Sequence, residues 1–455
     1  MSTSVDTKTA VEKPVSIWYM VGLVAFTLGT GVINFCLVTA LQVTLKPYTE
    51  STFVVGMLTA MISMNMIWAT PYASWKSDRI WTRFGRRKPL VLTMTPILVT
   101  TLLVLPHCSS LWPPIAHVIS ALASLLHLPQ PHMSTLWLVS LVVFVLTVAL
   151  ASLMGIVAAA IGDSVPDRQR PLAIGMWQFT ANGLATFLMG RYILGLTDPG
   201  VHRVGFATVA GAAHWPYTVA CCIFVVAAAI FVLVFRERYV PPRTGEKFRM
   251  FSYGRQIVQV REHLLIYVIL LFQPMFVLVG SWYFPKLATE RLGLSQAQYG
   301  SAHSWGGITV MAVCVPLGYL FSRIRFRRPF AMAACMMALV PITWGLFFMR
   351  TQAGIAFYFA AQQFAFAFFR LNFNPYIMEY TTPRSVGTIF GVTNAVNGIV
   401  RFTMIPLFGW LVDLMGKNYR LPLWGGYVGV VACVICLAMM RPPEKVRHLI
   451  DADPS

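Results

Sequence analysis

Long apolar stretches recur along this chain, and they restrict its fold more than any other feature. A helix that crosses the hydrocarbon core of a bilayer needs roughly 20 consecutive apolar residues. Candidate stretches begin at twelve places, near Trp18, Phe53, Pro89, Leu136, Pro171, Trp215, Leu264, Ser301, Pro329, Ile355, Val386 and Leu423. Lipid cannot hydrogen-bond to the backbone, so a spanning segment has to be a helix or part of a closed barrel. Because these stretches have the length of spanning helices, we expect a protein of transmembrane helices.

The scarcity of charge leads to the same expectation. Charged residues make up 11% of the 455 residues and hydrophobic residues make up 57%, whereas soluble domains carry about 25% charged residues. A water-exposed surface cannot be built from so few charges. The sequence therefore predicts an all-α integral membrane protein.

The formal net charge of +19 comes from basic residues that are unevenly distributed. Lysines and arginines are concentrated near both termini and in the even-numbered connections between spans, and they are sparse in the odd-numbered connections. Short basic loops stay in the cytoplasm, so we expect both termini to be cytoplasmic. Topology and contact with anionic lipid then account for the charge, and no nucleic-acid partner is expected. The lack of any N-x-[ST] sequence favours a cell (inner) membrane of prokaryotic type.

A long basic connection in the middle of the chain separates six predicted spans from six. The predicted parts are a cytoplasmic tail at 1–17, a six-helix bundle at 18–235, a basic cytoplasmic linker at 236–263, a second six-helix bundle at 264–440 and a cytoplasmic tail at 441–455. Short motifs recur at corresponding places in the two halves: SDRIWTRFGRRKPL (77–90) matches SRIRFRRPF (322–330), and IGDSVPDRQRPLAIG (161–175) matches MEYTTPRSVGTIFG (378–391). Such duplication is typical of transporters that work by alternating access.

The segment SDRIWTRFGRRKP between the second and third spans resembles the inter-helix signature of the major facilitator superfamily, which reads Gly, then Asp-Arg, then Gly-Arg-Arg. Its longer spacing and terminal proline are more similar to the sucrose-transporter and glycoside–pentoside–hexuronide branches. Ser74 stands where the general signature starts with glycine. The resemblance implies the major facilitator fold, with twelve transmembrane helices in two six-helix bundles, and transport of a sugar, glycoside or uronide.

Charged groups in this loop and in the corresponding loops form the predicted gate. Asp78 follows the second span, where Arg79 or Arg86 can pair with it. Pairs that form in one conformation and break in the other bias a two-state equilibrium by about 1–3 kcal/mol. The predicted gating residues are Asp78, Arg79, Gly85, Arg86, Arg87, Asp163, Arg168 and Glu379. The alternative is that these arginines only anchor the loop to anionic lipid.

Arg370 lies inside the predicted tenth span, in the run FAFAFFRLNFNPYIMEY (364–380). By helical rise it is roughly 7 Å from the bilayer midplane, where a charge costs about 3 kcal/mol or more. It therefore needs a partner or a water-filled cavity. Gln363, Arg370 and Asn374 fall on one face of the helix, which predicts a polar stripe that lines a central cavity. We expect the guanidinium of Arg370 to bind a carboxylate or phosphate of the solute.

Polar groups of other spans complete the predicted binding site. Arg401 lies in the eleventh span, and the alternative to substrate binding is a bond to Asn65 or to a backbone carbonyl. The first and seventh spans line the cavity in the family that the chain resembles, which adds one residue from each. The predicted substrate-binding residues are Arg370, Asn374, Gln363, Asn34, Gln273 and Arg401. Other buried polar groups are interpreted as contacts between helices, namely Gln178, Asn182 and His303.

Acidic residues are missing near the predicted midplane, so no sodium site is expected. Proton coupling through Asp163, Glu379 or His303 is favoured over sodium coupling, and uncoupled transport stays open. The sequence carries no G-x-x-x-x-G-K-[ST] nucleotide-binding motif and no metal or nucleophile constellation. Neither an enzyme nor a bound cofactor is therefore expected.

Together these features predict a monomeric secondary transporter, active or facilitative, that moves a small polar solute by alternating access and contacts membrane lipids. A sugar, glycoside or uronide, symported with a proton, is the leading expectation. A lipid, amphiphile or organic-anion transporter of the same fold is the first alternative. A non-transporting membrane sensor is the alternative of another class.

Overall fold

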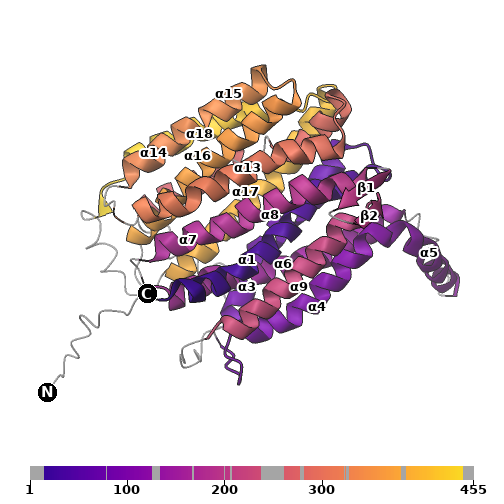
Figure 1. The fold of residues 1–455 in the computed structure, drawn as a ribbon, viewed down its shortest axis with the longest axis horizontal. Coiled ribbons are helices and arrows are strands. Elements are labelled where there is room, and N and C mark those ends of the chain that lie inside the picture. Colours follow the sequence, from indigo (N-terminus) through magenta and orange to yellow (C-terminus); the bar gives the residue numbers. More distant parts are fainter. Residues whose placement is uncertain are drawn as a thin grey trace.

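The computed structural model of the chain is a bundle of long helices whose axes are roughly aligned (Figure 1). It describes residues 15–77, 79–125, 134–166, 169–198, 200–204, 207–236, 261–276, 281–321, 323, 327–380 and 386–443. The predicted linker at 236–263 falls almost wholly outside these residues, so the predicted domain boundaries stay a prediction.

The first half of the chain forms the helices that Figure 1 draws in indigo to magenta. They are α1 Ile17–Phe35, α2 Leu41–Leu45, α3 Thr52–Ser77, α4 Lys88–Val104, α5 Cys108–Leu125, α6 Thr135–Ser164, α7 Arg170–Gln178, α8 Ala185–Leu188 and α9 Trp215–Val234. Three π-helical turns interrupt the first and fifth spans, at Cys36–Ala40, Phe179–Leu184 and Met189–Ile193.

The second half repeats this plan with one helix or broken helix for each predicted span. Its helices are α11 Arg261–Pro274, α12 Phe284–Lys286, α13 Gln296–Phe321, α14 Arg328–Met337, α15 Leu339–Phe347, α16 Gln352–Glu379, α17 Val386–Leu414 and α18 Pro422–Met439. A further π-helical turn, Leu287–Arg291, follows α12 in the seventh span. The first and seventh spans, which are counterparts in the duplicated plan, therefore both contain a π turn near one end.

Nine helical stretches of the described chain are long and apolar enough to cross a membrane. They are Ile17–Leu45, Thr52–Ser77, Lys88–Ala121, Thr135–Ile156, Trp215–Val234, Gln296–Phe321, Arg328–Phe347, Thr393–Leu414 and Pro422–Met439. The three other predicted spans, which begin near Pro171, Leu264 and Ile355, are helical as well. Two of them carry several Gln, Asn and Arg residues, and the description of the seventh is interrupted at 277–280. The all-α membrane fold is confirmed.

Two further features lie outside the predicted spans. A short antiparallel hairpin joins the fifth and sixth spans, with β1 Val201–Val204 paired to β2 Ala207–Ala210. Helix α5 continues from α4 and projects away from the rest of the bundle (Figure 1).

Two pairs of helices join the halves of the chain. Helix α3 packs on α17, and α13 packs on the broken helix that contains α7 and α8. Glycine makes these contacts close: a Cβ atom on Gly398 would lie 2.5 Å from the carbonyl oxygen of Ser63, and one on Gly307 would lie 2.6 Å from that of Gly183. Cβ atoms do not approach oxygen so closely, so these two crossings depend on glycine.

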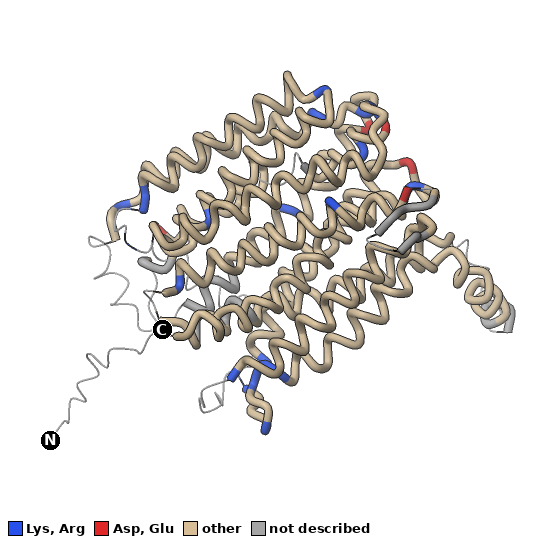
Figure 2. Tube along the Cα trace, viewed as in Figure 1, with Lys and Arg blue, Asp and Glu red and all other residues tan. Residues whose placement is uncertain are grey.

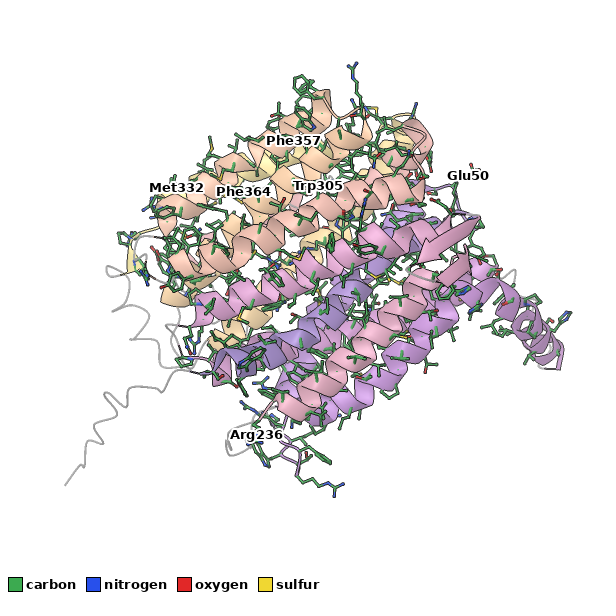
Figure 3. The ribbon with its side chains drawn as sticks, viewed as in Figure 1. Glu50, Arg236, Trp305, Met332, Phe357 and Phe364 are labelled. Atoms are coloured by element: carbon green, nitrogen blue, oxygen red, sulfur yellow. The ribbon has the colours of Figure 1, made fainter. Side chains whose placement is uncertain are left out.

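The two ends of the bundle differ in charge. Figure 3 labels Glu50 at one end and Arg236 at the other, and we call these the Glu50 end and the Arg236 end. Lys and Arg positions cluster at the Arg236 end, and a group of acidic positions lies at the Glu50 end (Figure 2). The asymmetry follows the charge pattern of the sequence.

Candidate functional site

Arg370 bridges the two halves of the protein from the middle of α16. Its Nη1 donates a hydrogen bond to Oε1 of Gln178, at 3.3 Å, at the end of α7 in the other half. The same oxygen accepts a hydrogen bond from Nδ2 of Asn182, one turn further on. The guanidinium carbon lies 4.5 Å from the centre of the Phe366 ring, a cation–π contact within α16. Arg370 is therefore partly satisfied, and by neutral groups only.

Arg401 of α17 lies near enough to Arg370 for the two positive charges to interact. Its Nε is buried and has no hydrogen-bond partner. In the part of the chain that the structure describes, no carboxylate forms an ion pair with either arginine. Two guanidinium groups thus lie within electrostatic range of each other at membrane depth, and the described residues supply no ion pair to either.

The predicted bond between Arg401 and Asn65 is absent from the described residues. Nδ2 of Asn65 donates to the hydroxyl of Thr147 at 2.8 Å, and its Oδ1 accepts from the indole N–H of Trp68 at 3.1 Å. The hydrogen bonds of Asn65 among the described residues thus lie within the first half of the chain, and the alternative that Arg401 contacts Asn65 or a backbone carbonyl stays a prediction.

The other predicted binding residues are spread over three helices. Gln363 and Asn374 lie on α16 and are partly buried, as is Asn34 on α1, whereas Gln273 on α11 is only 5% exposed. The buried Oε1 of Gln363 has no hydrogen-bond partner, and neither has the buried Oδ1 of Asn397 on α17. The structure brings Arg370 together with Gln178 and near Arg401. It gives no direct contact between Arg370 and Asn34 or Gln273 among the described residues.

Sequence reasoning assigned Gln178 and Asn182 to helix contacts and missed their place beside Arg370. Their spacing of four residues in an apolar span was the available signal. The π-helical turn Phe179–Leu184, which follows Gln178 and contains Asn182, has no simple sequence signature. Such π turns are frequent at functional sites.

The predicted gate is only partly within the described residues. Gly85 has φ of +93°, in the left-handed region that favours glycine, and closes a tight turn with Thr82. The guanidinium of Arg79 lies 4.4 Å from the Trp75 ring centre, Arg87 is 3% exposed and Arg86 is partly buried. Asp78, Arg168 and the side chains of Asp163 and Glu379 lie outside what is described. The proposed pairing with Asp78 stays a prediction.

Each half of the protein caps a helix of the other half at the Glu50 end. Asp413, at the end of α17, accepts hydrogen bonds from the backbone N–H of Phe53, at 3.1 Å, and the hydroxyl of Ser51, at 3.2 Å, at the start of α3. Asp198 accepts hydrogen bonds from the backbone N–H groups of Gln296 and Ala297, at 3.2 and 3.0 Å, at the start of α13. The first N–H groups of a helix lack internal partners and favour a negative charge.

Two cationic side chains reinforce this contact between halves. Nζ of Lys417 lies 2.6 Å from Oδ1 of Asp413 and donates to the carbonyl oxygen of Glu50 at 2.9 Å. Nη1 of Arg191 donates to the hydroxyl of Ser301 at 2.7 Å. These contacts hold the two halves together at the Glu50 end.

Apolar spanning helices in two linked halves, with arginines buried between them, define a multi-pass membrane protein. The sequence profile of the Major Facilitator Superfamily matches residues 19–404, which is most of the chain, and the chain belongs to this superfamily. It is therefore a membrane transporter of that superfamily, whose members are transporters rather than enzymes. None of the curated proteins compared with the chain gives a significant match.

Proposed function

We propose that this transporter moves a small hydroxylated carboxylate, such as a hexuronate or another sugar acid, by alternating access between the two halves. The observation that carries the proposal is the pair of neighbouring arginines, Arg370 and Arg401, without a described acidic partner. The charge pattern supports a cell membrane location with the Arg236 end in the cytoplasm.

The energetics of the arginine pair favour an anionic solute. A guanidinium at membrane depth costs about 3 kcal/mol by insertion scales, and a second one nearby adds repulsion. A carboxylate placed between them accepts charge-assisted hydrogen bonds from both. Its arrival would replace repulsion by attraction, which is a direct source of binding free energy.

Neutral groups on the two helices that carry the arginines support hydroxyl groups on the same solute. The unpaired Oε1 of Gln363 and Oδ1 of Asn397 are buried acceptors. A carboxylate offers no proton to such oxygens, whereas a sugar hydroxyl donates one. Leaving a buried acceptor unpaired costs about 1–3 kcal/mol, so a solute with both kinds of group satisfies more of the site than a simple anion does.

Coupling and assembly follow from the same residues as proposals. The lack of a described carboxylate beside the arginines favours proton coupling or no coupling over sodium coupling. The likeness to the sucrose-transporter and glycoside–pentoside–hexuronide branches supports the sugar class. A monomer suffices for the mechanism, since both halves lie in one chain.

The test is thermal-shift binding on the purified full-length protein with glucuronate, glucose and small organic acids. We expect glucuronate to stabilise the wild type and to lose its effect in Arg370→Gln. The matched control is Arg350→Gln, because Arg350 is an exposed arginine in the loop before α16. Equal stabilisation of wild type and Arg370→Gln would refute the assigned role of Arg370.

A rival within the same fold is a transporter of anionic amphiphiles, whose headgroup would also meet Arg370. Labelled lysophospholipid and labelled glucuronate, each tested for entry into proteoliposomes, separate the two. Glucuronate uptake without lysophospholipid movement supports our proposal, and the reverse favours the amphiphile. Binding without flux of either compound favours a sensor.

A further inference from the structure

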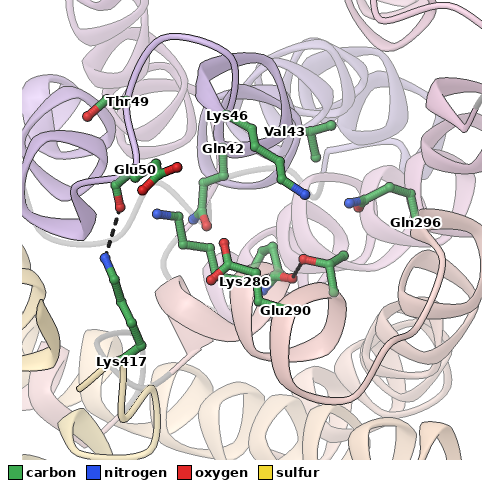
Figure 4. Close-up of a pocket in the computed structure, with 11 residues that line it drawn as sticks. Gln42, Val43, Lys46, Thr49, Glu50, Lys286, Glu290, Gln296 and Lys417 are labelled. Carbon is green, nitrogen blue, oxygen red and sulfur yellow. Dashed lines mark hydrogen bonds between the residues drawn. The ribbon is translucent and has the colours of Figure 1, made fainter. Parts of the chain in front are cut away.

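A polar pocket lies between the halves at the Glu50 end (Figure 4), and Arg370 is not among the residues that line it. Its volume is about 330 Å³, within the range of about 300–1,000 Å³ for small-molecule sites. The first half lines it with Gln42, Val43, Lys46, Thr49 and Glu50, and the second half with Pro285, Lys286, Thr289, Glu290, Gln296 and Lys417. The π-helical turns Cys36–Ala40 and Leu287–Arg291 adjoin it from opposite halves.

The amide of Gln42 is fixed with its oxygen unpaired. Its Nε2 donates hydrogen bonds to the carbonyl oxygens of Val38 and Trp282. A flipped amide would place oxygen against two carbonyl oxygens, so this orientation is the only satisfied one. Oε1 of Gln42 is buried without a hydrogen-bond partner, and so is Oε1 of Gln296 on the other side of the pocket. Two acceptors from opposite halves are thus left without donors.

Lys286, by contrast, is a donor that lacks an acceptor among the described residues. It is only 8% exposed although it carries an ammonium group. In the described chain no acceptor lies within hydrogen-bond distance of its Nζ, and no carboxylate forms an ion pair with it. Glu290, which is one turn away, accepts a hydrogen bond from the hydroxyl of Tyr419 instead. Burial, and then this bond to a carboxylate, raises the pKa of Tyr419, so Tyr419 keeps its proton at physiological pH.

The chemistry of the unpaired groups describes a ligand. The two amide oxygens need hydroxyl or amine donors, whereas the ammonium of Lys286 needs an anionic or carbonyl acceptor. Lys417 is already paired with Asp413, which leaves two lysines and two glutamates among the charged lining residues. Glu290 and Glu50 lie within electrostatic range of Lys286 but form no ion pair with it in the described chain, so its Nζ is left for water or for a ligand.

We propose that this pocket is a second solute site, which binds a hydroxylated carboxylate of the class assigned to the Arg370 site. This inference rests on the proposed function for the class of solute, but not for the existence of the pocket. The carboxylate lies at Lys286 and the hydroxyl groups donate to Gln42 and Gln296. Because its ligands come from both halves, the occupied pocket holds the Glu50 end closed.

A regulatory effect follows from this geometry. A solute that bridges the halves opposes the opening that transport requires, so high concentrations on the Glu50 side slow uptake. Uptake by the wild type is then expected to pass through a maximum as glucuronate increases. The Lys286→Met variant is expected to saturate without the decline.

The test counts glucuronate sites by equilibrium binding of the radiolabelled compound to purified full-length protein. We expect two sites in the wild type and one in Lys286→Met, in Gln42→Leu and in Arg370→Gln. The double variant Lys286→Met/Arg370→Gln is expected to bind none. Lys88→Met, which removes a lysine at the opposite end of the bundle, is the matched control and should keep both sites. Size-exclusion profiles verify that each variant is folded, and Gln42→Leu serves if Lys286→Met is not.

The outcomes separate the two proposals. If Lys286→Met and Gln42→Leu both still bind glucuronate at two sites, the proposal of a solute site in the pocket is overturned. It is also overturned if the wild type binds at one site only and Arg370→Gln alone removes that site. In both cases the proposed function stands. One site that Lys286→Met removes and Arg370→Gln leaves supports the second site and contradicts the central one. No saturable glucuronate binding by the wild type overturns the second site for this solute class.

Discussion

Replacing Asp413 by alanine should loosen the Glu50 end of the protein. The change removes the carboxylate that caps α3 by accepting hydrogen bonds from the N–H of Phe53 and the hydroxyl of Ser51. It also removes the ion pair with Lys417. Loss of an N-cap costs about 0.5–2 kcal/mol, and a partly exposed ion pair is worth about 0–1 kcal/mol. The sum is about 0.5–3 kcal/mol, which corresponds to a shift of roughly 2–150-fold toward the open state.

Hydrogen–deuterium exchange of the purified protein measures this shift at the residues concerned. Peptides that contain the starts of α3 and α13 should exchange roughly 2–150-fold faster in Asp413→Ala. Asp413→Asn keeps an acceptor but loses the charge, so its effect should be smaller. Glu262→Gln is the control, because Glu262 pairs with Arg441 at 3.8 Å in the second half, outside the contact at the Glu50 end.

The decisive observation is coupling between the two caps. If the caps break in one opening of the Glu50 end, Asp413→Ala also speeds exchange at Gln296 and Ala297, which Asp198 caps. Faster exchange confined to the start of α3 would mean local fraying and would refute the closing role. Unchanged exchange at Phe53 would refute the cap itself.

Two further changes test the interior. Arg401→Met removes a buried charge that has no described partner. The ligand-free variant should therefore gain about 2–3 kcal/mol of stability, and glucuronate should no longer stabilise it. A melting temperature below that of the wild type would make Arg401 a structural residue. Gly398→Leu places a Cβ 2.5 Å from the Ser63 carbonyl oxygen, so overpacking should cost about 1–3 kcal/mol of stability. The control is Ile399→Leu at the exposed neighbouring position, which should cost little stability. Equal melting temperatures for these two variants would contradict the close crossing of α3 and α17.

Features within one span were largely predictable from the sequence. The apolar stretches gave the helices and the basic loops gave a difference between the ends, because length and charge act locally. The depth of Arg370 and the polar face it shares with Gln363 follow from helical rise and periodicity alone. The fifth and tenth spans are less apolar than the rest, and their polar residues are the ones that meet near Arg370.

Contacts between spans were not predictable in the same way. Gln178 meets Arg370 from a helix 192 residues away, and nothing in either span specifies the partner. Asp198 and Asp413 each cap a helix in the other half of the chain, and their sequence positions do not specify those partners. Distances across the interface depend on how the helices cross, and glycine positions such as Gly307 set those crossings only once the pairs of helices are known.

The π-helical turns bear on how this chain tolerates insertions and deletions. A π turn accommodates one residue more than an α-helical path of the same course, and one residue corresponds to about 100° of rotation along an α-helix. Deleting one residue from Cys36–Ala40 therefore restores a regular α-helix of the same course, so the face that carries Gln42 keeps its orientation relative to the face that packs Phe26 and Ile33 in the core. The first span thus tolerates a one-residue deletion at this turn, whereas the same deletion in a regular α-helix would redirect every side chain beyond it.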